Sequence, residues 1–240
     1  MTSSPRLAGR IALITGASRG IGAAVARRFA AEGAQVVLTA RTVGGLEEVD
    51  DAIRSAGGLP ATLIPLDLIK LDEIDRLGPA IYERFGRLDI LVGNAGTLGA
   101  LSPVAYSDPK IIQQVMTINV MANYRLIRTV DPLLRQSDAG RAIFVTDRVT
   151  EETAPFWGLY AASKIALETM VRAYAAEVTR PSLRVNLVYP GVVATVLRSK
   201  AFPGEDRSGL LQPDGVTDLF VELAEPACTR HGETLRAVVD

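Results

Sequence analysis

Tyr160 and Lys164 stand four residues apart at the end of the segment from Val145 to Lys164, VTDRVTEETAPFWGLYAASK. In a helix, residues at this spacing project from the same face, so the phenol and the ammonium group would lie side by side. A free phenol titrates at about pH 10, and a neighbouring positive charge stabilises the phenolate and lowers that pKa. Such a pair can pass a proton to or from a substrate oxygen. Ordinary surface residues can share this spacing, so the rest of the chain must decide.

The elements that would position this pair alternate along the chain. Short runs, apolar on both faces, are separated by stretches of helical period, which is the pattern of a parallel sheet wrapped by helices. We therefore expect one domain over residues 1–240, an α/β Rossmann-type fold doubly wound around a mostly parallel, seven-stranded sheet. The expected strands are 11–15, 35–40, 61–66, 89–93, 142–146, 184–189 and a short one within 234–238, with helices at about 20–32, 44–56, 70–85, 109–130, 158–179 and 214–224.

The composition excludes several classes of protein. Lysine and arginine number 26 against 27 aspartates and glutamates, which gives no electrostatic footprint for nucleic acid or an anionic membrane. The single cysteine, Cys228, excludes an internal disulfide framework, and the single histidine, His231, argues against a histidine-based metal site. No apolar run has the length of a signal-peptide core or a membrane span. We expect a cytoplasmic protein without a metal.

The loop after the first expected strand is rich in glycine. Gly16, Gly20 and Gly22 are spaced G-x-x-x-G-x-G between that strand and an amphipathic helix. Glycines let the backbone turn tightly and approach a pyrophosphate, which then lies at the positive end of the helix. Three glycines alone would indicate only a turn, but a strand before them and a helix after them predict dinucleotide binding.

The end of the second expected strand selects the dinucleotide. An acidic residue at this place holds the ribose hydroxyls of NAD, whereas the 2′-phosphate of NADP requires a cation. Ala40 occupies the place of the acid and Arg41 follows it, while Arg19 lies within the glycine turn. Arg41 could instead be a solvated charge at a strand end. Two guanidinium groups without a carboxylate between them favour NADP(H).

Further motifs follow the next strands. Asp67 stands in PLDL, and Gly93 to Gly96 read GNAG. Together with the glycine turn and the Y-x-x-x-K spacing, they make residues 8–195 resemble the short-chain dehydrogenase/reductase family in its compact single-domain form. The N-N-A-G motif of that family loses its first asparagine here. Its P-G-x-x-x-T segment matches Pro190, Gly191 and Thr195.

The resemblance implies an NADP(H)-dependent oxidoreductase that transfers hydride between the nicotinamide and a carbonyl or alcohol substrate. It implies that Tyr160 is the acid/base, that Lys164 also holds the nicotinamide ribose, and that Asn119 positions a proton-relaying water. It further implies a homodimer or homotetramer. The resemblance also implies a set of cofactor-binding residues. They are Gly16, Ser18, Arg19, Gly20, Ile21, Gly22, Arg41, Asp67, Leu68, Asn94, Ala95, Gly96, Tyr160, Lys164, Pro190, Gly191, Val193 and Thr195.

Asp147 departs from the family pattern. Counting back from Tyr160, it occupies the place of the catalytic serine, which orients the substrate carbonyl. An ionised carboxylate would repel a developing alkoxide and raise the pKa of Tyr160. At about 5 Å and an effective dielectric constant of about 20, the interaction is roughly 3 kcal/mol.

Three interpretations of Asp147 stay open. It could be protonated and donate a hydrogen bond as the serine would. Thr146 could supply the hydroxyl if a bulge rotates the strand end. Alternatively, the activity is weakened or lost, which leaves a silent NADP-binding or regulatory protein.

The substrate side is expected to be apolar and covered. Residues 196–213 are charged and rich in glycine and proline, as a mobile substrate lid would be. Apolar side chains on either side of Tyr160 could line a pocket over the nicotinamide. They are Phe156, Trp157, Val192, Val196, Leu197 and Phe202.

Overall fold

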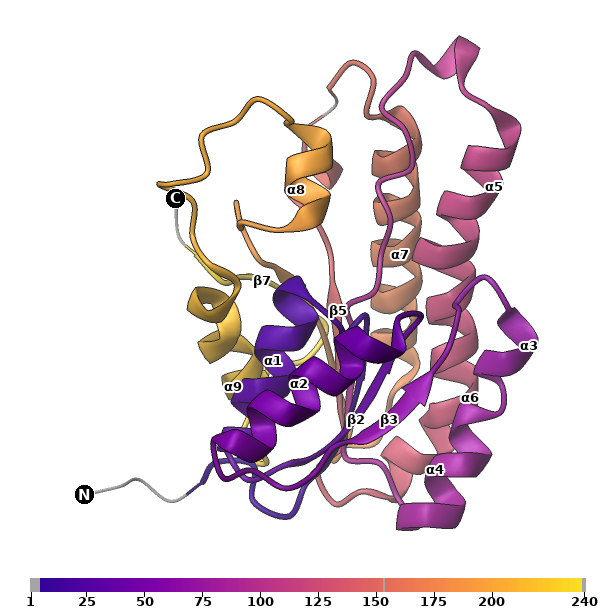
Figure 1. Cartoon of the computed structure of the whole chain (residues 1–240). Coiled ribbons are helices and arrows are strands. Elements are labelled where there is room, and N and C mark those ends of the chain that lie inside the picture. The colour runs from indigo at the N-terminus through magenta and orange to yellow at the C-terminus, as the bar shows by residue number, and fades with distance from the viewer. Residues whose placement is uncertain (1–4, 153, 239–240) are drawn as a thin grey trace.

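The computed structural model describes residues 5–152 and 154–238, which form a seven-stranded sheet in the order β3-β2-β1-β4-β5-β6-β7 (Figure 1). Every pairing between neighbouring strands is parallel, which confirms the predicted Rossmann-type architecture. The strands are β1 (Ile11–Thr15), β2 (Gln35–Ala40), β3 (Thr62–Pro65), β4 (Ile90–Gly93), β5 (Arg141–Val145), β6 (Arg184–Tyr189) and β7 (Thr234–Arg236).

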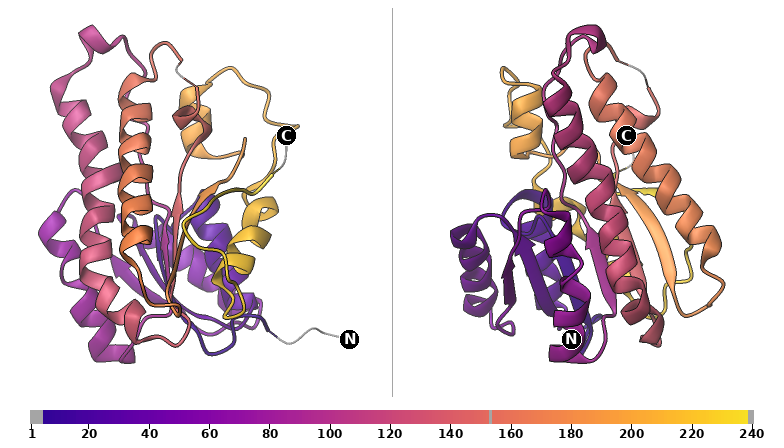
Figure 2. Two further views of the ribbon diagram at one scale, coloured as in Figure 1. Left: turned by 180° about the vertical axis from the view of Figure 1, so that it is seen from behind. Right: turned by 90° about the vertical axis from the view of Figure 1, so that its right-hand side faces the viewer.

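Helices cover both faces of the sheet (Figure 2). The apolar residues of α1, α2 and α9 pack on one face, and those of α4, α6 and α7 pack on the other. The helical segments are α1 (Gly20–Ala31), α2 (Val43–Ser55), α3 (Leu71–Ile74), α4 (Leu77–Phe85), α5 (Pro109–Met116), α6 (Ala122–Gln136), α7 (Gly158–Glu177), α8 (Val196–Ala201) and α9 (Thr217–Ala224), with the short turns η1 (Val104–Tyr106), η2 (Thr117–Met121), η3 (Arg148–Thr150) and η4 (Pro213–Val216).

The strand order reverses between β1 and β4. Chain connections from β1 run outward to β2 and β3, whereas those from β4 run in the opposite direction to β5 and beyond. The loops after β1 and β4 therefore diverge to opposite faces and leave a crevice at the C-terminal edge of the sheet. This is where the sequence predicts the ligand.

The prediction of one continuous helix over residues 70–85 is wrong, because a side chain from α6 separates this segment into α3 and α4. Thr129 Oγ1 donates to the carbonyl of Asp75 at 2.9 Å and accepts from the backbone N–H of Gly78 at 3.3 Å. A Cβ at Gly78 would lie 2.2 Å from the Thr129 carbonyl oxygen. The break therefore depends on a contact between residues 51 positions apart, which local periodicity does not reveal.

The helix expected over residues 109–130 is also interrupted. The π-helical turn η2 joins α5 to α6, and α6 continues to Gln136 although Pro132 lies within it. Asn119 lies in the middle of η2. A π-helical turn inside a longer helix commonly marks a functional position, because it rotates one side chain out of the regular register.

Candidate functional site

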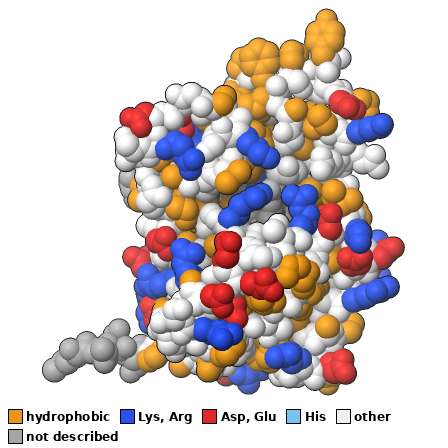
Figure 3. Space-filling view, viewed as in Figure 1, with side chains coloured by type: hydrophobic (Ala, Val, Ile, Leu, Met, Phe, Trp, Pro, Cys, Tyr) orange, Lys and Arg blue, Asp and Glu red, His pale blue; other side chains and the backbone are white. Residues whose placement is uncertain are grey.

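A cleft with a volume of about 790 Å³ lies at the C-terminal edge of the sheet. Loops after β1 to β6 contribute to it, together with α7 and the residues around α8. All the predicted site residues line this cleft except Gly22 and Asn119. Figure 3 shows lysine and arginine side chains beside the hollow in this face of the molecule. The topology therefore gathers side chains predicted from well-separated motifs into one cavity.

The glycine turn has the backbone that its sequence predicts. Gly16 and Gly20 have φ angles of 65° and 58°, in the left-handed region that glycine adopts without strain. A Cβ at Gly22 would lie 2.4 Å from the Gly16 carbonyl oxygen. Gly22 therefore allows α1 to pack against the turn rather than lining the cleft itself. The N-terminal N–H groups of α1 begin at this turn, where an anion is favoured.

The loop after β4 supports the glycine turn through hydrogen bonds with Thr15, which is fully buried. Thr15 Oγ1 accepts hydrogen bonds from the backbone N–H groups of Asn94 at 3.0 Å and Ala95 at 3.1 Å. The Asn94 amide donates to the Thr15 carbonyl at 2.9 Å. Asn94 therefore fixes the glycine turn relative to the loop after β4. At Gly93, where the family motif has an asparagine, a Cβ would lie 2.5 Å from the ring of Phe144, so no larger side chain fits without a shift.

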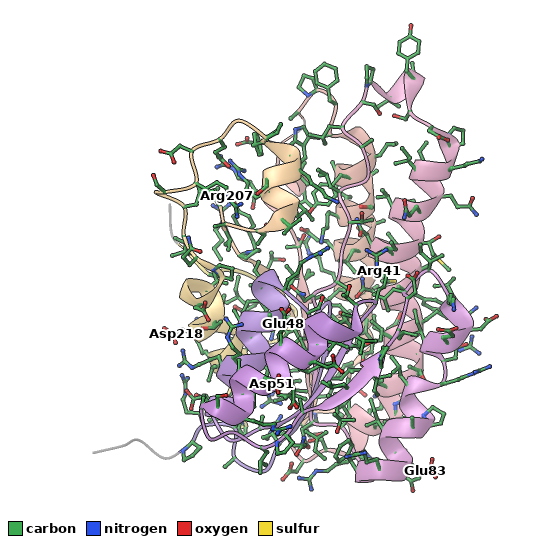
Figure 4. The ribbon with its side chains drawn as sticks, viewed as in Figure 1. Arg41, Glu48, Asp51, Glu83, Arg207 and Asp218 are labelled. Atoms are coloured by element: carbon green, nitrogen blue, oxygen red, sulfur yellow. The ribbon has the colours of Figure 1, made fainter. Side chains whose placement is uncertain are left out.

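Two exposed arginines border the other end of the cleft. Arg41 follows β2, where Figure 4 shows it between that strand and α2, and Arg19 immediately precedes α1. No ion-pair partner of either guanidinium is found among residues 5–152 and 154–238, so both positive charges remain uncompensated there. Asp67 Oδ1 accepts from the backbone N–H of Ile69 at 3.2 Å, so this residue caps its own turn while lining the cleft.

Asp147 faces Tyr160. The Tyr160 hydroxyl donates to Asp147 Oδ2 at 2.9 Å, and Asp147 Oδ1 accepts from the backbone N–H of Val149 at 3.2 Å. Thr146 Oγ1 instead donates to Glu168 Oε1 at 2.6 Å, and its backbone N–H donates to the Val188 carbonyl. This geometry does not support the interpretation in which Thr146 replaces the family's serine. Both oxygens of Asp147 accept hydrogen bonds.

The pKa of Tyr160 is raised, which is the direction predicted for a carboxylate at Asp147 and the opposite of the direction predicted for Lys164. Burial raises the pKa of Tyr160 well above its ordinary value, and the charge and hydrogen bond of Asp147 raise it further. The Lys164 ammonium group, which donates to the Val145 carbonyl at 3.0 Å and lies 5.8 Å from the centre of the Tyr160 ring, does not reverse this direction. The expectation that Lys164 leaves Tyr160 with a lowered pKa is therefore wrong for this structure.

Lys164 is itself buried between two acidic side chains. Burial lowers the pKa of Lys164, while the charges of Asp147 and Glu168 raise it. Glu168 lies four residues further along α7 and is paired with Arg172, whose Nη2 is 2.9 Å from Glu168 Oε2. Sequence reasoning missed Glu168, although its position one helical turn after Lys164 was visible.

Asn119 holds the loop after β4 rather than lining the cleft. Its side chain accepts from the backbone N–H of Thr97 at 2.8 Å and donates to the Thr97 carbonyl at 2.9 Å and to Ser163 Oγ at 2.9 Å. Its own carbonyl accepts from the Asn123 amide. These bonds connect η2 to α7 close to Tyr160, because Ser163 donates to the Tyr160 carbonyl.

The expected lid contains a helix and folds over the cleft. Thr195 caps α8 by accepting from the backbone N–H of Arg198 at 3.1 Å, and Arg198 forms a two-pronged ion pair with Glu205. The Arg198 guanidinium lies 3.8 Å from the centre of the Phe202 ring, which packs on Trp157. Leu211 returns beside Val193.

Five of the six apolar residues expected in the pocket line the cleft; Phe156 does not, and its side chain is 56% exposed. Charged residues on the substrate side were missed by sequence reasoning, although they stand next to positions that it had named. Arg148 and Glu152 follow Asp147, while Arg198 and Lys200 lie in the lid. Among the described segments, no group of three metal-ligating side chains is found, and no helix is long and apolar enough to cross a membrane.

Comparisons with known proteins agree with this site. The family model described as short chain dehydrogenase matches residues 10–206. The oxidoreductase YciK of Escherichia coli K12, which is uncharacterized, is 38% identical over 216 residues, 89% of this chain and 85% of that protein. A fatty acyl-CoA reductase of Acinetobacter baylyi is 34% identical over 188 residues, 78% of this chain and 63% of that protein.

Solved structures are similar over the whole chain. A short chain dehydrogenase from Salmonella enterica serovar Typhi has a TM-score of 0.95 at 36% identity and covers 100% of both chains. A structure from Escherichia coli CFT073 complexed with NADPH has a TM-score of 0.94 at 36% identity, covering 99% of this chain and 100% of that one. The chain thus belongs to the short-chain dehydrogenase/reductase family of oxidoreductases.

Proposed function

We propose that this protein is an NADP(H)-dependent oxidoreductase in which Tyr160 donates the proton to the reacting group of a small-molecule substrate. The observation that carries the proposal is the position of the Tyr160 hydroxyl in the same cleft as the glycine turn. A proton donor and a dinucleotide cradle within one cavity are what a hydride-transfer enzyme requires.

The residues present fit the dinucleotide. A Cβ at Gly16 would meet Ala95 and Asn94 at 3.0 Å, and the left-handed backbone leaves the turn open to a pyrophosphate at the start of α1. Arg19 and Arg41 would hold the 2′-phosphate, in keeping with the NADPH and NADP complexes of the Escherichia coli and Shigella flexneri relatives. When bound, the nicotinamide ring supplies or accepts hydride.

The protonation of Tyr160 favours reduction. A phenol whose pKa is raised stays protonated at neutral pH, so it can donate a proton but is a poor base. Alcohol oxidation would have to start from a Tyr160 already deprotonated beside the negative charge of Asp147, whereas reduction starts from the protonated phenol. We therefore assign Tyr160 the role of general acid.

The second candidate function is a catalytically weakened or silent NADP-binding protein. One observation favours it: Asp147 accepts the hydrogen bond of Tyr160, which the substrate would otherwise receive. In this case the cleft would bind the dinucleotide without turnover.

Two measurements test the proposal and separate the two functions. Fluorescence titration should show tighter binding of NADPH than of NADH, and Arg41→Ala should weaken NADPH binding roughly tenfold while leaving NADH unchanged. Arg84→Ala, at an exposed arginine of α4, is the matched control. Equal affinity for NADH would overturn the assignment of Arg41.

The second measurement is turnover on a broad panel of substrates. Turnover that is lost in Tyr160→Phe identifies an enzyme, whereas NADPH binding without turnover identifies the silent protein.

The proposed assembly is a cytoplasmic homodimer or homotetramer. Large apolar side chains that are 42% to 48% exposed lie on η2, α6 and α7, at Met121, Tyr124 and Ile165. A second copy of the chain would cover them. Sedimentation of a monomer at micromolar concentration would contradict this assembly.

A further inference from the structure

The position of Asp147 constrains the chemistry of the substrate, given the proposed function on which this inference rests. Its two oxygens are fixed, one by the Val149 backbone and one by the Tyr160 hydroxyl. The carboxylate therefore lies against the proton donor itself, where the reacting heteroatom of a substrate must also lie. In most carbonyl reductions this place must favour the negative charge that develops on oxygen.

A carboxylate at this place opposes the reduction of a C=O bond and favours the reduction of a protonated C=N bond. Reduction of a ketone or aldehyde takes a neutral group towards an alkoxide, which Asp147 would repel. Reduction of a protonated imine takes a cation to a neutral amine and develops no negative charge. A carboxylate attracts that cation and keeps its nitrogen protonated, because an opposite charge nearby favours the charged form.

We propose that the protein reduces carbon–nitrogen double bonds, with Tyr160 protonating the imine nitrogen of the substrate and Asp147 accepting a hydrogen bond from the N–H of the resulting cation. In the step, hydride from the reduced nicotinamide dinucleotide forms a C–H bond with the imine carbon. The π electron pair of the C=N bond moves to nitrogen and becomes the lone pair of a neutral secondary amine. The imine is oxidising agent and the dinucleotide is reducing agent. The proton that makes the imine a cation comes from Tyr160 and remains on nitrogen.

Three other cationic side chains that line the cleft are held by polar partners of their own. Arg148 is paired with Glu152 at 2.9 Å, and Arg198 is held by both oxygens of Glu205. Lys164 donates to the Val145 carbonyl. Trp157, whose ring meets that of Tyr160 edge-on with centres 6.0 Å apart, also lines the cleft, and an aromatic ring can attract a cation.

The binding test uses product-like ligands, so that it does not depend on turnover. Tetrahydroisoquinoline, a secondary ammonium ion at neutral pH, is compared with the neutral alcohol 2-tetralol by calorimetry on the NADP⁺-loaded protein. We expect the ammonium ion to bind more tightly than the alcohol, and Asp147→Asn and Asp147→Ser to weaken it at least tenfold while leaving the alcohol unchanged or tighter. An ammonium affinity no greater than that of the alcohol, or one that Asp147→Asn leaves intact, overturns the proposal.

The turnover test compares cyclic imines with matched cyclic ketones, including 3,4-dihydroisoquinoline with 2-tetralone. We expect kcat/KM to favour the imines at least 100-fold in the parent and to shift towards the ketones by at least that factor in Asp147→Ser. If the parent reduces ketones with the same kcat/KM as imines, and Tyr160→Phe abolishes this turnover, this inference is overturned but the proposed function stands. Absence of NADPH binding would instead overturn the proposed function.

Discussion

The Tyr160 hydroxyl donates to Asp147 Oδ2 over 2.9 Å, whereas Lys164, the residue expected to activate the phenol, donates to the Val145 carbonyl. Tyr160 is only 3% exposed. Burial and a neighbouring carboxylate both oppose the phenolate, so both raise the pKa of Tyr160. The site is therefore arranged to keep the phenol protonated, and this arrangement can be tested by titration.

Replacing Asp147 with asparagine should lower the pKa of Tyr160. The substitution removes the carboxylate charge and weakens the hydrogen bond, which are the second and third causes of the raised pKa, while burial remains. Ultraviolet difference titration, with Tyr160→Phe as the reference that identifies the signal, measures this change. An unchanged titration of Tyr160 in Asp147→Asn would mean that burial alone controls the phenol.

Two buried tyrosines should make the protein less stable in alkali. The pKa values of Tyr160 and Tyr174 are raised, first by burial and then by Asp147 and Asp131 respectively. The folded chain then retains protons that the unfolded chain loses above about pH 10, so the free energy of unfolding falls as pH rises from there towards the folded-state pKa values.

This dependence should be reduced in Tyr160→Phe and in Tyr174→Phe. Urea unfolding at a series of pH values measures it, with Tyr106→Phe as the control for loss of a hydroxyl, since Tyr106 is 85% exposed. If neither buried variant has a smaller pH dependence than the control, the two buried phenols do not cause the alkaline loss of stability.

Features encoded locally were predicted from the sequence. The glycine turn is predictable because Gly16 and Gly20 need a left-handed backbone that their neighbours in sequence also indicate. The parallel sheet is predictable because its strands are apolar on both faces. The place of Asp147 followed from its spacing to Tyr160, and in the structure its carboxylate does face the phenol.

Features that depend on contacts between distant residues were not predictable. Thr129 separates α3 from α4 through hydrogen bonds to residues on another helix. Asn119 binds Thr97 and Ser163 instead of lining the cleft, and neither partner is a defined position of a motif, since Ser163 occupies a variable position of Y-x-x-x-K. The pKa of Tyr160 is raised first by burial, and spacing along a helix does not determine how deeply a side chain is buried.

Gly22→Ala should destabilise the fold and abolish most dinucleotide binding. Its Cβ would lie 2.4 Å from the Gly16 carbonyl oxygen and 2.5 Å from the Asn94 amide nitrogen, so the turn would have to move. We expect a loss of roughly 1–3 kcal/mol in the free energy of unfolding, typical of overpacking. Gly44→Ala is the matched control, because it lies in α2 with no atom within 4 Å of its Cβ. That substitution should stabilise by about 0.5–1 kcal/mol. Equal effects of both would refute the packing role of Gly22.

The ion pair between Arg198 and Glu205 should keep the lid folded over the cleft. Glu205 accepts from both Nε and Nη2 of Arg198, and this guanidinium lies against Phe202, which packs on Trp157. Glu205→Gln removes the charge that fixes the guanidinium, so residues 196–213 should open more often. Limited trypsin digestion should then cut after Arg198, Lys200 or Arg207 several times faster than in the parent.

Glu83→Gln, an exposed glutamate of α4 well away from the lid (Figure 4), is the control for loss of one negative charge. Faster cleavage only in Glu205→Gln, with an unchanged melting temperature, would identify local opening rather than global unfolding. The substrate KM should rise in the same variant, because the lid residues Leu197 and Phe202 line the cleft. A Glu205→Gln protein cleaved no faster than Glu83→Gln would show that the apolar contacts of Phe202 hold the lid without the ion pair.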